Sequence, residues 1–192
     1  MPPAVKIVAS EILAKDWGTL SRYTIDYTRR DGRVQRHHRE VYDHGMAAAV
    51  LLHCPDRDVV TLVRQFRLPP FLDGRDGFLL EVCAGLLDGD TPEACARREA
   101  EEEAGIRIGE LRHAFDTIVS PGSLTETISC FVGTYTADAA ISPGGGLEAE
   151  GEDIEIVELP VAEALAMIAD GRIIDAKTIM LLQHLALGQQ NI

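Results

Sequence analysis

The sequence lacks the features that would place it at a membrane or on a nucleic acid. No apolar run approaches the roughly 18 residues that a membrane span needs, and the N-terminus lacks the charged-then-apolar pattern of a signal peptide. Acidic residues outnumber basic ones by 31 to 18, so the net charge is −13 and no basic stripe is visible. We therefore expect a cytoplasmic protein that binds neither membranes nor nucleic acids.

Cysteine is scarce and scattered. The four cysteines form no CxxC pair and have no ladder of histidines nearby, so a zinc site is not expected. Free, buried thiols in a reducing compartment are the simpler interpretation. No internal repeat or low-complexity tract is present, and 192 residues suffice for one domain with a small appendage.

The first 44 residues predict a small β appendage. Residues 4–9 are a strand candidate, residues 19–28 alternate polar and apolar positions, and Asp31-Gly32 is a hairpin turn. The returning strand at 33–43 is too polar to lie in a core. Because such a piece buries little apolar surface, it should dock against something, and we expect a second subunit as its partner.

Residues 45–192 mix strand and helix patterns, which predicts an α/β sandwich. Two apolar runs, 46–53 and 59–66, are typical of central strands that are buried on both faces. The other strand candidates are 78–85, 111–120, 127–136 and 152–160. The helix candidates begin at the caps Asp90 or Thr91, at 161, and at Asp175, and they end near Gly105, 171 and 187.

Two connections stand out between these elements. Residues 67–77 contain Pro69-Pro70 and Asp73-Gly74, so we expect a loop there. Residues 137–151 are rich in glycine and acidic side chains and are too long for a simple connection. That length favours a mobile functional loop.

The stretch REAEEEAG at 98–105 carries most of the chemical information. On a helix, Glu99, Glu102 and Glu103 share one face, and each like-charged pair costs about 0.2–0.5 kcal/mol. The face is either solvated or holds a cation. Alanines at 96, 100 and 104 leave little apolar surface to hold such a helix down, and the loop before it can bring backbone carbonyls close to a ligand.

Magnesium suits this pattern, because Mg²⁺ binds one or two carboxylates together with water and substrate phosphates. An EF-hand calcium loop is the rival interpretation, with Asp88, Asp90 and Glu99 at its positions 1, 3 and 12. Glu93 then occupies position 6, where the sharp turn of that loop requires glycine. We reject the calcium loop.

Residues 84–106, AGLLDGDTPEACARREAEEEAGI, resemble the Nudix box, G-x5-E-x7-R-E-U-x-E-E-x-G-U, in which U is apolar. The second half of the box matches fully at Arg98, Glu99, Ala100, Glu102, Glu103, Gly105 and Ile106. The first half departs from the pattern, because only four residues separate Gly85 from Asp90 and Asp replaces the expected Glu. That departure affects the loop and leaves the helix turn intact.

The resemblance extends over nearly the whole chain, to the nucleoside-diphosphate-sugar branch of the Nudix hydrolases. RQFR (64–67), the SPG loop (120–126) and the GGG segment (144–146) resemble that branch, and Pro121, sixteen residues beyond Gly105, is a feature of its ADP-ribose pyrophosphatases. The GDP-mannose pyrophosphatase type is the most similar. The segments that carry this closer likeness are HHREVYDHG (37–45), EVCAGLLDGDTPE (81–93) and DAKT (175–178).

This resemblance implies an α/β/α sandwich of the Nudix type with a mixed sheet at 45–192, preceded by the β segment at 1–44. It also implies homodimers that exchange their N-terminal segments. The implied reaction is Mg²⁺-dependent hydrolysis of GDP-mannose to GMP and mannose 1-phosphate. The alternatives are an ADP-ribose pyrophosphatase, which gives AMP and ribose 5-phosphate, and a non-catalytic nucleotide-sugar sensor. A sensor would be expected to lose box glutamates, and this chain keeps them.

The resemblance also assigns the metal and the proton transfer. Glu99, Glu103 and the Ala84 carbonyl would bind Mg²⁺, for which Mn²⁺ could substitute, and Glu102 would be an additional or water-mediated ligand. Arg98 would orient these carboxylates. The general base, which also joins the metal-binding set, would be Glu152 at the end of the acidic loop. Glu148, Glu150 and Asp153 compete for that role by their proximity in sequence.

Substrate contacts are implied at several separate positions. They are Trp17, His38, Arg39, Glu40, Arg67, Ala84, Gly85, Leu86, Glu126, Gly151 and Lys177. Three of these have simpler interpretations. Arg67 could form a surface salt bridge, Trp17 could pack at a dimer seam, and Lys177 could be an exposed lysine on a helix.

Overall fold

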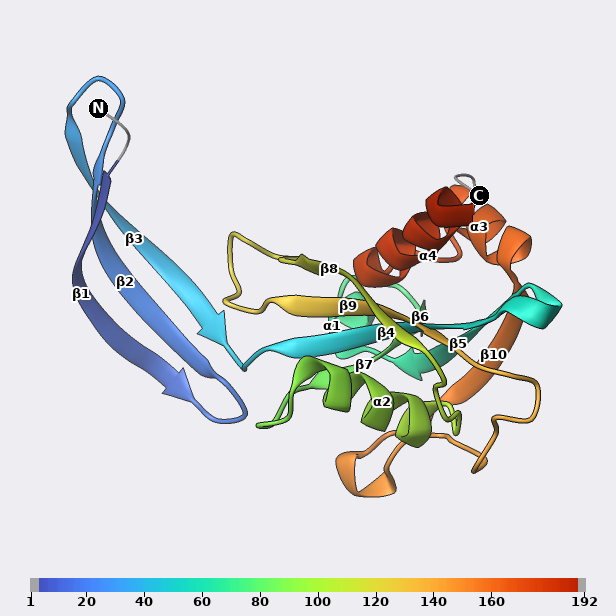
Figure 1. The fold of residues 1–192 in the computed structure, drawn as a ribbon. Helices are drawn as coiled ribbons and strands as arrows, with labels where there is room; N and C mark the ends of the chain where they lie inside the picture. The colour runs from blue at the N-terminus through green and yellow to red at the C-terminus, as the bar shows by residue number, and fades with distance from the viewer. Residues whose placement is uncertain (1–3, 190–192) are drawn as a thin grey trace. The chain divides into compact units, whose positions relative to one another are not determined.

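The computed structural model describes residues 4–189, which form two compact units (Figure 1). One unit contains the chain up to Met46 together with Ile118–Thr127. The other contains Ala47–Thr117 and the chain from Ile128 onward. Each unit is described by itself below.

The first unit is a three-stranded antiparallel sheet in the order β1-β2-β3. Its strands are β1 (Ala4–Lys15), β2 (Thr19–Thr28) and β3 (Val34–Asp43). The hairpin from β2 to β3 is confirmed, with Gly32 at φ 83° in its turn. Strand β1 is longer than the predicted 4–9, because two register shifts, at Ile7/Ala9 and Ile12/Ala14, interrupt the alternation by which a strand is recognised.

Residues 118–127 belong to this unit although they lie far along the chain. The Tyr42 amide donates to the Ser123 carbonyl at 2.8 Å, and the Thr125 amide donates to the Tyr42 carbonyl at 3.2 Å. The Thr125 hydroxyl donates to Asp43 Oδ1 at 2.8 Å. The SPG loop is therefore fastened to the end of β3.

The second unit contains a seven-stranded mixed sheet. Its main path runs β10-β5-β4-β9-β8, with β4 and β9 parallel, while β6 pairs with β5 and β7 pairs with β4. The strands are β4 (Ala47–Cys54), β5 (Val59–Phe66), β6 (Phe78–Glu81), β7 (Cys83–Leu86), β8 (Leu111–Thr117), β9 (Ile128–Thr134) and β10 (Glu155–Pro160). Strand β4 is buried throughout, which confirms the prediction of central strands at 46–53 and 59–66.

Helices cover both faces of this sheet (Figure 1). Helix α2 (Pro92–Glu103) lies on one face, and α3 (Val161–Ala169) and α4 (Ala176–Gln189) lie on the other. Two buried clusters fill the layers, one containing Val50, Phe131 and the α2 alanines, the other containing Leu51, Leu62 and Leu181. The predicted α/β/α sandwich with a mixed sheet is confirmed.

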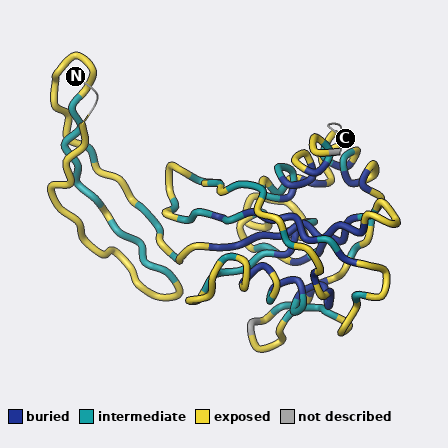
Figure 2. The backbone as a smooth tube through the Cα atoms, viewed as in Figure 1, coloured by how far each residue is buried: buried dark blue, intermediate teal, exposed yellow. Residues whose placement is uncertain are grey.

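The alanines of α2 act differently from our expectation. Ala96 and Ala100 are fully buried and Ala104 is nearly so, because small side chains let the helix backbone lie close against the sheet. They hold the helix down rather than leave it loose. Figure 2 shows this buried stripe on α2, together with the buried central strands.

Two local predictions for the second unit need correction. Residues 78–85 form two strands, because β6 and β7 pair with different neighbours and the chain changes partner at Val82. Residues 67–77 contain a short helix, α1 (Leu68–Leu72), whose prolines occupy its first turn, where a missing N–H costs nothing. The connections of this unit also contain two 3₁₀ turns, at Pro55–Arg57 and Glu148–Glu150.

All four cysteines are buried and free, as predicted. Across residues 4–189, no helix combines the length and the hydropathy that crossing a membrane demands.

Candidate active site

Helix α2 buries two carboxylates one turn apart, those of Glu99 and Glu103. Their exposed fractions are only 7% and 1%. Burial raises the pKa of Glu99 to about 7, and the charge of Glu102 adds to this against the opposing effect of Arg98. Burial raises the pKa of Glu103 to about 8, and the charge of Glu99 contributes. The folded chain therefore confines negative charge that it does not fully neutralise.

Strands β7 and β5 hold these two carboxylates in place. The Ala84 amide donates to Glu103 Oε2 at 3.1 Å, and Gln65 Nε2 donates to Glu103 Oε1 at 3.2 Å. A Cβ at Gly85 would lie 1.9 Å from Glu99 Oε1, so only glycine admits the Glu99 carboxylate against this strand. Sequence reasoning missed Gln65, which gives no local signal because it is one polar residue among others on its strand.

Arg98 ties this turn of the helix to the loop before it. Its Nη1 donates to Glu99 Oε1 at 2.7 Å and to Glu102 Oε2 at 3.0 Å. Its Nη2 donates to the Leu86 carbonyl at 3.0 Å. Its Nε donates to Asp90 Oδ2 at 3.2 Å. One guanidinium thus fixes two of the acidic side chains and both ends of the loop.

The unusual loop between Gly85 and Asp90 closes as a tight turn. The Asp90 amide donates to the Leu87 carbonyl at 2.7 Å, and Asp88 and Gly89 adopt φ values of 47° and 96°. Two successive left-handed residues shorten the path, and the shorter Asp side chain still reaches Arg98. The departure from the box pattern is therefore accommodated locally.

This donor set fits a hard divalent cation. Two buried carboxylates with raised pKa values supply oxygen ligands whose charge needs a counter-ion, and the missing side chain of Gly85 lets the Glu99 carboxylate lie directly against the strand backbone. Within residues 4–189, no three His, Cys, Asp or Glu side chains form a complete cage for a metal ion. Mg²⁺ does not require one, because it retains water and accepts backbone or substrate oxygens.

The glycine-rich segment closes on the C-terminal end of α2. The amides of Gly145 and Gly146 donate to the carbonyls of Glu103 and Glu102, at 2.9 and 3.1 Å. These carbonyls have no partner within the helix, so the segment supplies the bonds that a helix end lacks. At Gly144, φ is 64° and a Cβ would lie 2.7 Å from the Glu103 carbonyl oxygen, so a larger residue does not fit.

This closure brings Glu152 close to the glutamate pair. The Leu147 amide donates to Glu152 Oε2 at 2.8 Å, and the charge of Glu152 contributes to the raised pKa of both Glu99 and Glu103. Glu148 and Asp153 are exposed, and the Glu150 side chain lies outside the part of the chain that is described. Gly151, which ends the 3₁₀ turn and directly precedes Glu152, adopts a left-handed conformation with φ 74°.

A second charged cluster lies where β5, β6 and α4 meet. Arg67 donates to both oxygens of Glu81, from Nε at 2.8 Å and from Nη2 at 3.1 Å. Lys177 Nζ donates to Glu81 Oε2 at 2.5 Å and lies 3.1 Å from Asp175 Oδ1. The Lys177 side chain is only 12% exposed, so its interpretation as a surface lysine is wrong. Sequence reasoning missed Glu81, although a lone charge within an apolar strand is a signal for a buried ion pair.

The predicted substrate contacts of the hairpin lie on β3 in the first unit. Thr24 Oγ1 and His38 Nδ1 are 3.1 Å apart. Arg39 Nη1 donates to the His38 carbonyl at 2.8 Å, and Arg22 Nη2 donates to Glu40 Oε1 at 3.0 Å. Their role at the substrate stays a prediction.

Trp17 and Glu126 lie in the same unit, on either side of His44. The Trp17 ring stacks on the His44 ring at 4.9 Å and is nevertheless 70% exposed, so its outer face is free to pack against another surface. Glu126 Oε1 lies 4.0 Å from His44 Nδ1, and both side chains are largely buried. Their role at the substrate also stays a prediction.

The family model of the NUDIX domain matches residues 43–182, and a model described as the GDP-mannose pyrophosphatase NudK N-terminal domain matches residues 4–42. The two matches together span nearly the whole chain.

Several similar proteins carry the same name. A GDP-mannose pyrophosphatase of Klebsiella pneumoniae subsp. pneumoniae is 46% identical over 182 residues, which cover 94% of this chain and 91% of that protein. One of Escherichia coli O157:H7 is 45% identical over 189 residues, which cover 98% of both chains. A crystal structure of an ADP compounds hydrolase aligns over 97% of this chain and 95% of that one, with a TM-score of 0.74 and 19% identity, which is a likeness of fold.

The raised pKa of Glu103 gives a prediction about stability. Between its ordinary value of 4.5 and about 8, the folded protein holds a proton that the unfolded chain has released, so stability falls as pH rises through this window. Glu103→Gln removes that dependence. Without divalent cations, we expect the variant to gain at least about 1 kcal/mol relative to the wild type between pH 5.5 and 8.5.

Urea unfolding in EDTA at several pH values measures this difference. Glu101→Gln, on the exposed side of the same helix, is the control and should keep a constant difference from the wild type. An unchanged difference between Glu103→Gln and the wild type across this range would contradict the assigned burial cost.

Proposed function

The chain belongs to the Nudix family, and we propose from that membership that it hydrolyses the diphosphate bond of a nucleoside diphosphate sugar with the help of Mg²⁺. The buried glutamate pair with Glu152 beside it is the observation that carries this proposal. GDP-mannose is the preferred substrate, because relatives 45–46% identical over nearly the whole chain are named for it. ADP-ribose is the alternative.

Cleavage of a diphosphate requires that its negative charge be neutralised and that a water molecule lie in line with the scissile P–O bond. Glu99, Glu103 and the Ala84 carbonyl would hold Mg²⁺, and Glu102 would contribute directly or through water. The bound cation supplies the neutralising charge, and Mn²⁺ could replace it. Arg98 keeps the carboxylates in place through its donations to Glu99 and Glu102.

Proton removal from the attacking water is assigned to Glu152. One of its oxygens is held by the Leu147 amide, so the other remains available to accept a proton. Glu152 is partly exposed, whereas Glu99 and Glu103 are buried, so the Glu152 carboxylate is accessible to water and to a substrate. A purely binding protein would not need to bury two like-charged carboxylates with a third, partly exposed one beside them, which favours an enzyme over a sensor.

We also propose that the protein is a homodimer held by its N-terminal unit. Every residue of β1 is exposed, including Val5, Ile7 and Ile12 at 60%, 63% and 65%. An apolar edge strand of this length is an association surface. A second copy of the chain is the occupant we expect.

The first test is hydrolysis of GDP-mannose and ADP-ribose at equal concentration, with Mg²⁺, with Mn²⁺ and with EDTA. We expect GMP and mannose 1-phosphate in the presence of a divalent cation, and a roughly 100-fold or greater loss of activity in Glu103→Gln, because a metal ligand is removed. Glu101→Gln serves again as the control. Cation-dependent turnover retained by Glu103→Gln would refute its metal-binding role.

The general base is tested by exchanging the competing carboxylates. We expect Glu152→Gln to lower kcat by roughly 10²- to 10⁴-fold with little change in KM, which is the usual contribution of a general base. Glu148→Gln, in the same loop but exposed, is the matched control. If the loss of kcat follows Glu148→Gln or Asp153→Asn instead, the assignment to Glu152 is wrong.

Light scattering after size-exclusion chromatography tests the dimer. We expect twice the mass of one chain for the wild type, and a shift toward one chain for Ile7→Lys combined with Ile12→Lys, because buried cations would disfavour association. Lys6→Gln, on the same strand, should leave the mass unchanged. A wild type with the mass of a single chain would refute the proposed dimer.

A further inference from the structure

Glu81 is a charged side chain at the end of an otherwise apolar strand, β6. It is 2% exposed, and a buried carboxylate is tolerated only when it is paired and hydrogen-bonded. Three donations satisfy it, two from Arg67 and one from Lys177. Burial alone would raise the pKa of Glu81, but Lys177 and Arg67 lower it below its ordinary value, so the carboxylate is ionised.

Glu81, Arg67 and Lys177 form a triad, and Arg67 is its most exposed member. The side chains of Glu81 and Lys177 are 3% and 12% exposed, whereas that of Arg67 is 39% exposed. Arg67 lies at the end of β5, immediately before α1, and its parallel donations to Glu81 fix the plane of the guanidinium. Among the charges that raise its pKa against the effect of burial is that of Glu103, so Arg67 lies within electrostatic reach of the glutamate pair.

The second cation compensates Glu81 from the other side. With Asp175 the cluster holds two cations and two carboxylates, so its formal charge is zero, and of the two cations Arg67 is the more exposed. Asp175 Oδ1 lies 3.1 Å from the same Lys177 Nζ that donates to Glu81. Its charge faces the N-terminus of α4, where it accepts from the Thr178 amide and hydroxyl at 3.0 and 2.6 Å.

A hydrogen bond from a backbone amide connects the two elements that carry Glu81 and Lys177. The Val82 amide, next to Glu81, donates to the Thr178 hydroxyl at 2.9 Å, which joins the start of α4 to the junction of β6 and β7. Figure 1 shows α4 lying over the face of the sheet to which β6 belongs. Lys177 and Glu81 are therefore held at a fixed separation.

We propose that Glu81 and Lys177 are positioning residues: Lys177 holds the Glu81 carboxylate in place, and Glu81 aims the Arg67 guanidinium at the substrate diphosphate. This inference rests on the proposed function.

The test compares Glu81→Gln with the double variant Glu81→Gln/Lys177→Met. The single variant leaves Lys177 buried with less compensation, so it should lose stability as well as affinity. The double variant removes both buried charges and should regain stability, while Arg67 remains unheld. We expect KM for GDP-mannose to stay raised roughly 10-fold or more in both, the scale of a hydrogen bond to a charged group, with kcat little changed.

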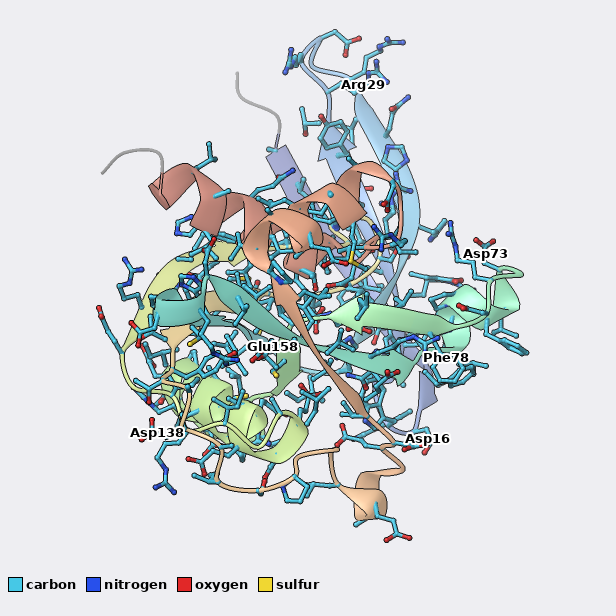
Figure 3. All side chains as sticks on the ribbon, turned by 90° about the vertical axis from the view of Figure 1, so that its right-hand side faces the viewer. Asp16, Arg29, Asp73, Phe78, Asp138 and Glu158 are labelled. Atoms are coloured by element: carbon cyan, nitrogen blue, oxygen red, sulfur yellow. The ribbon has the colours of Figure 1, made fainter. Side chains whose placement is uncertain are left out.

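The control is the pair Arg57–Glu158, which joins the 3₁₀ turn at Pro55–Arg57 to β10 of the same sheet. Arg57 also donates to both oxygens of Glu158, at 2.7 and 2.6 Å. Figure 3 labels Glu158 on β10 and Phe78 at the start of β6 at well-separated points. Glu158→Gln should therefore leave KM unchanged. A double variant that regains both stability and the wild-type KM would overturn the inference, because Glu81 and Lys177 would then serve the fold alone.

Calorimetric titration with GDP-mannose in EDTA separates this inference from the proposed function. If the wild type binds GDP-mannose without hydrolysing it when Mg²⁺ is added, the proposed catalysis fails. In that case a roughly 10-fold weaker Kd in the double variant still supports the positioning role. Equal Kd values for the wild type and the double variant refute that role, whatever the outcome of the hydrolysis assay.

Discussion

The burial of two like charges, those of Glu99 and Glu103, is the constraint around which the second unit is arranged. The alanine face of α2 lets the helix lie close to the sheet, and the missing side chain of Gly85 admits the Glu99 carboxylate. Larger residues at these positions would move the helix outward and return the carboxylates to water. The hydrogen bonds from Gln65 and the Ala84 amide then reduce the cost of burial without removing it, because the pKa values stay raised.

The same turn of helix also organises the glycine-rich loop. The side chains of Glu102 and Glu103 point to the site, while their carbonyls, free because the helix ends there, bind the amides of Gly146 and Gly145. Closure of the loop adds the charge of Glu152 to a place that is already too negative. A divalent cation would relieve the repulsion among all three carboxylates at once.

The features of the site that depend on residues close in sequence could be predicted from the sequence. Helical spacing alone places Glu99, Glu102 and Glu103 on one face, and proline and glycine mark the ends of α2. Contacts between distant segments were not predictable, because they depend on strand register and helix docking. Gln65 is 38 residues from Glu103, and Lys177 is 96 residues from Glu81. The attachment of residues 118–127 to β3 is of the same kind, since no local pattern records it.

The two charged clusters show that neighbours, rather than burial, decide the state of a buried acid. Glu81 and Glu103 are equally sequestered, and burial is the largest influence on both. Glu81 has two cations of its own and stays ionised, whereas Glu103 faces another carboxylate and has a raised pKa. The first cluster is charge-balanced within the chain and leaves the Arg67 guanidinium partly exposed, while the second would be balanced by the cation of the proposed function. A diphosphate would thus meet positive charge from two directions, one built into the fold and one acquired from solution.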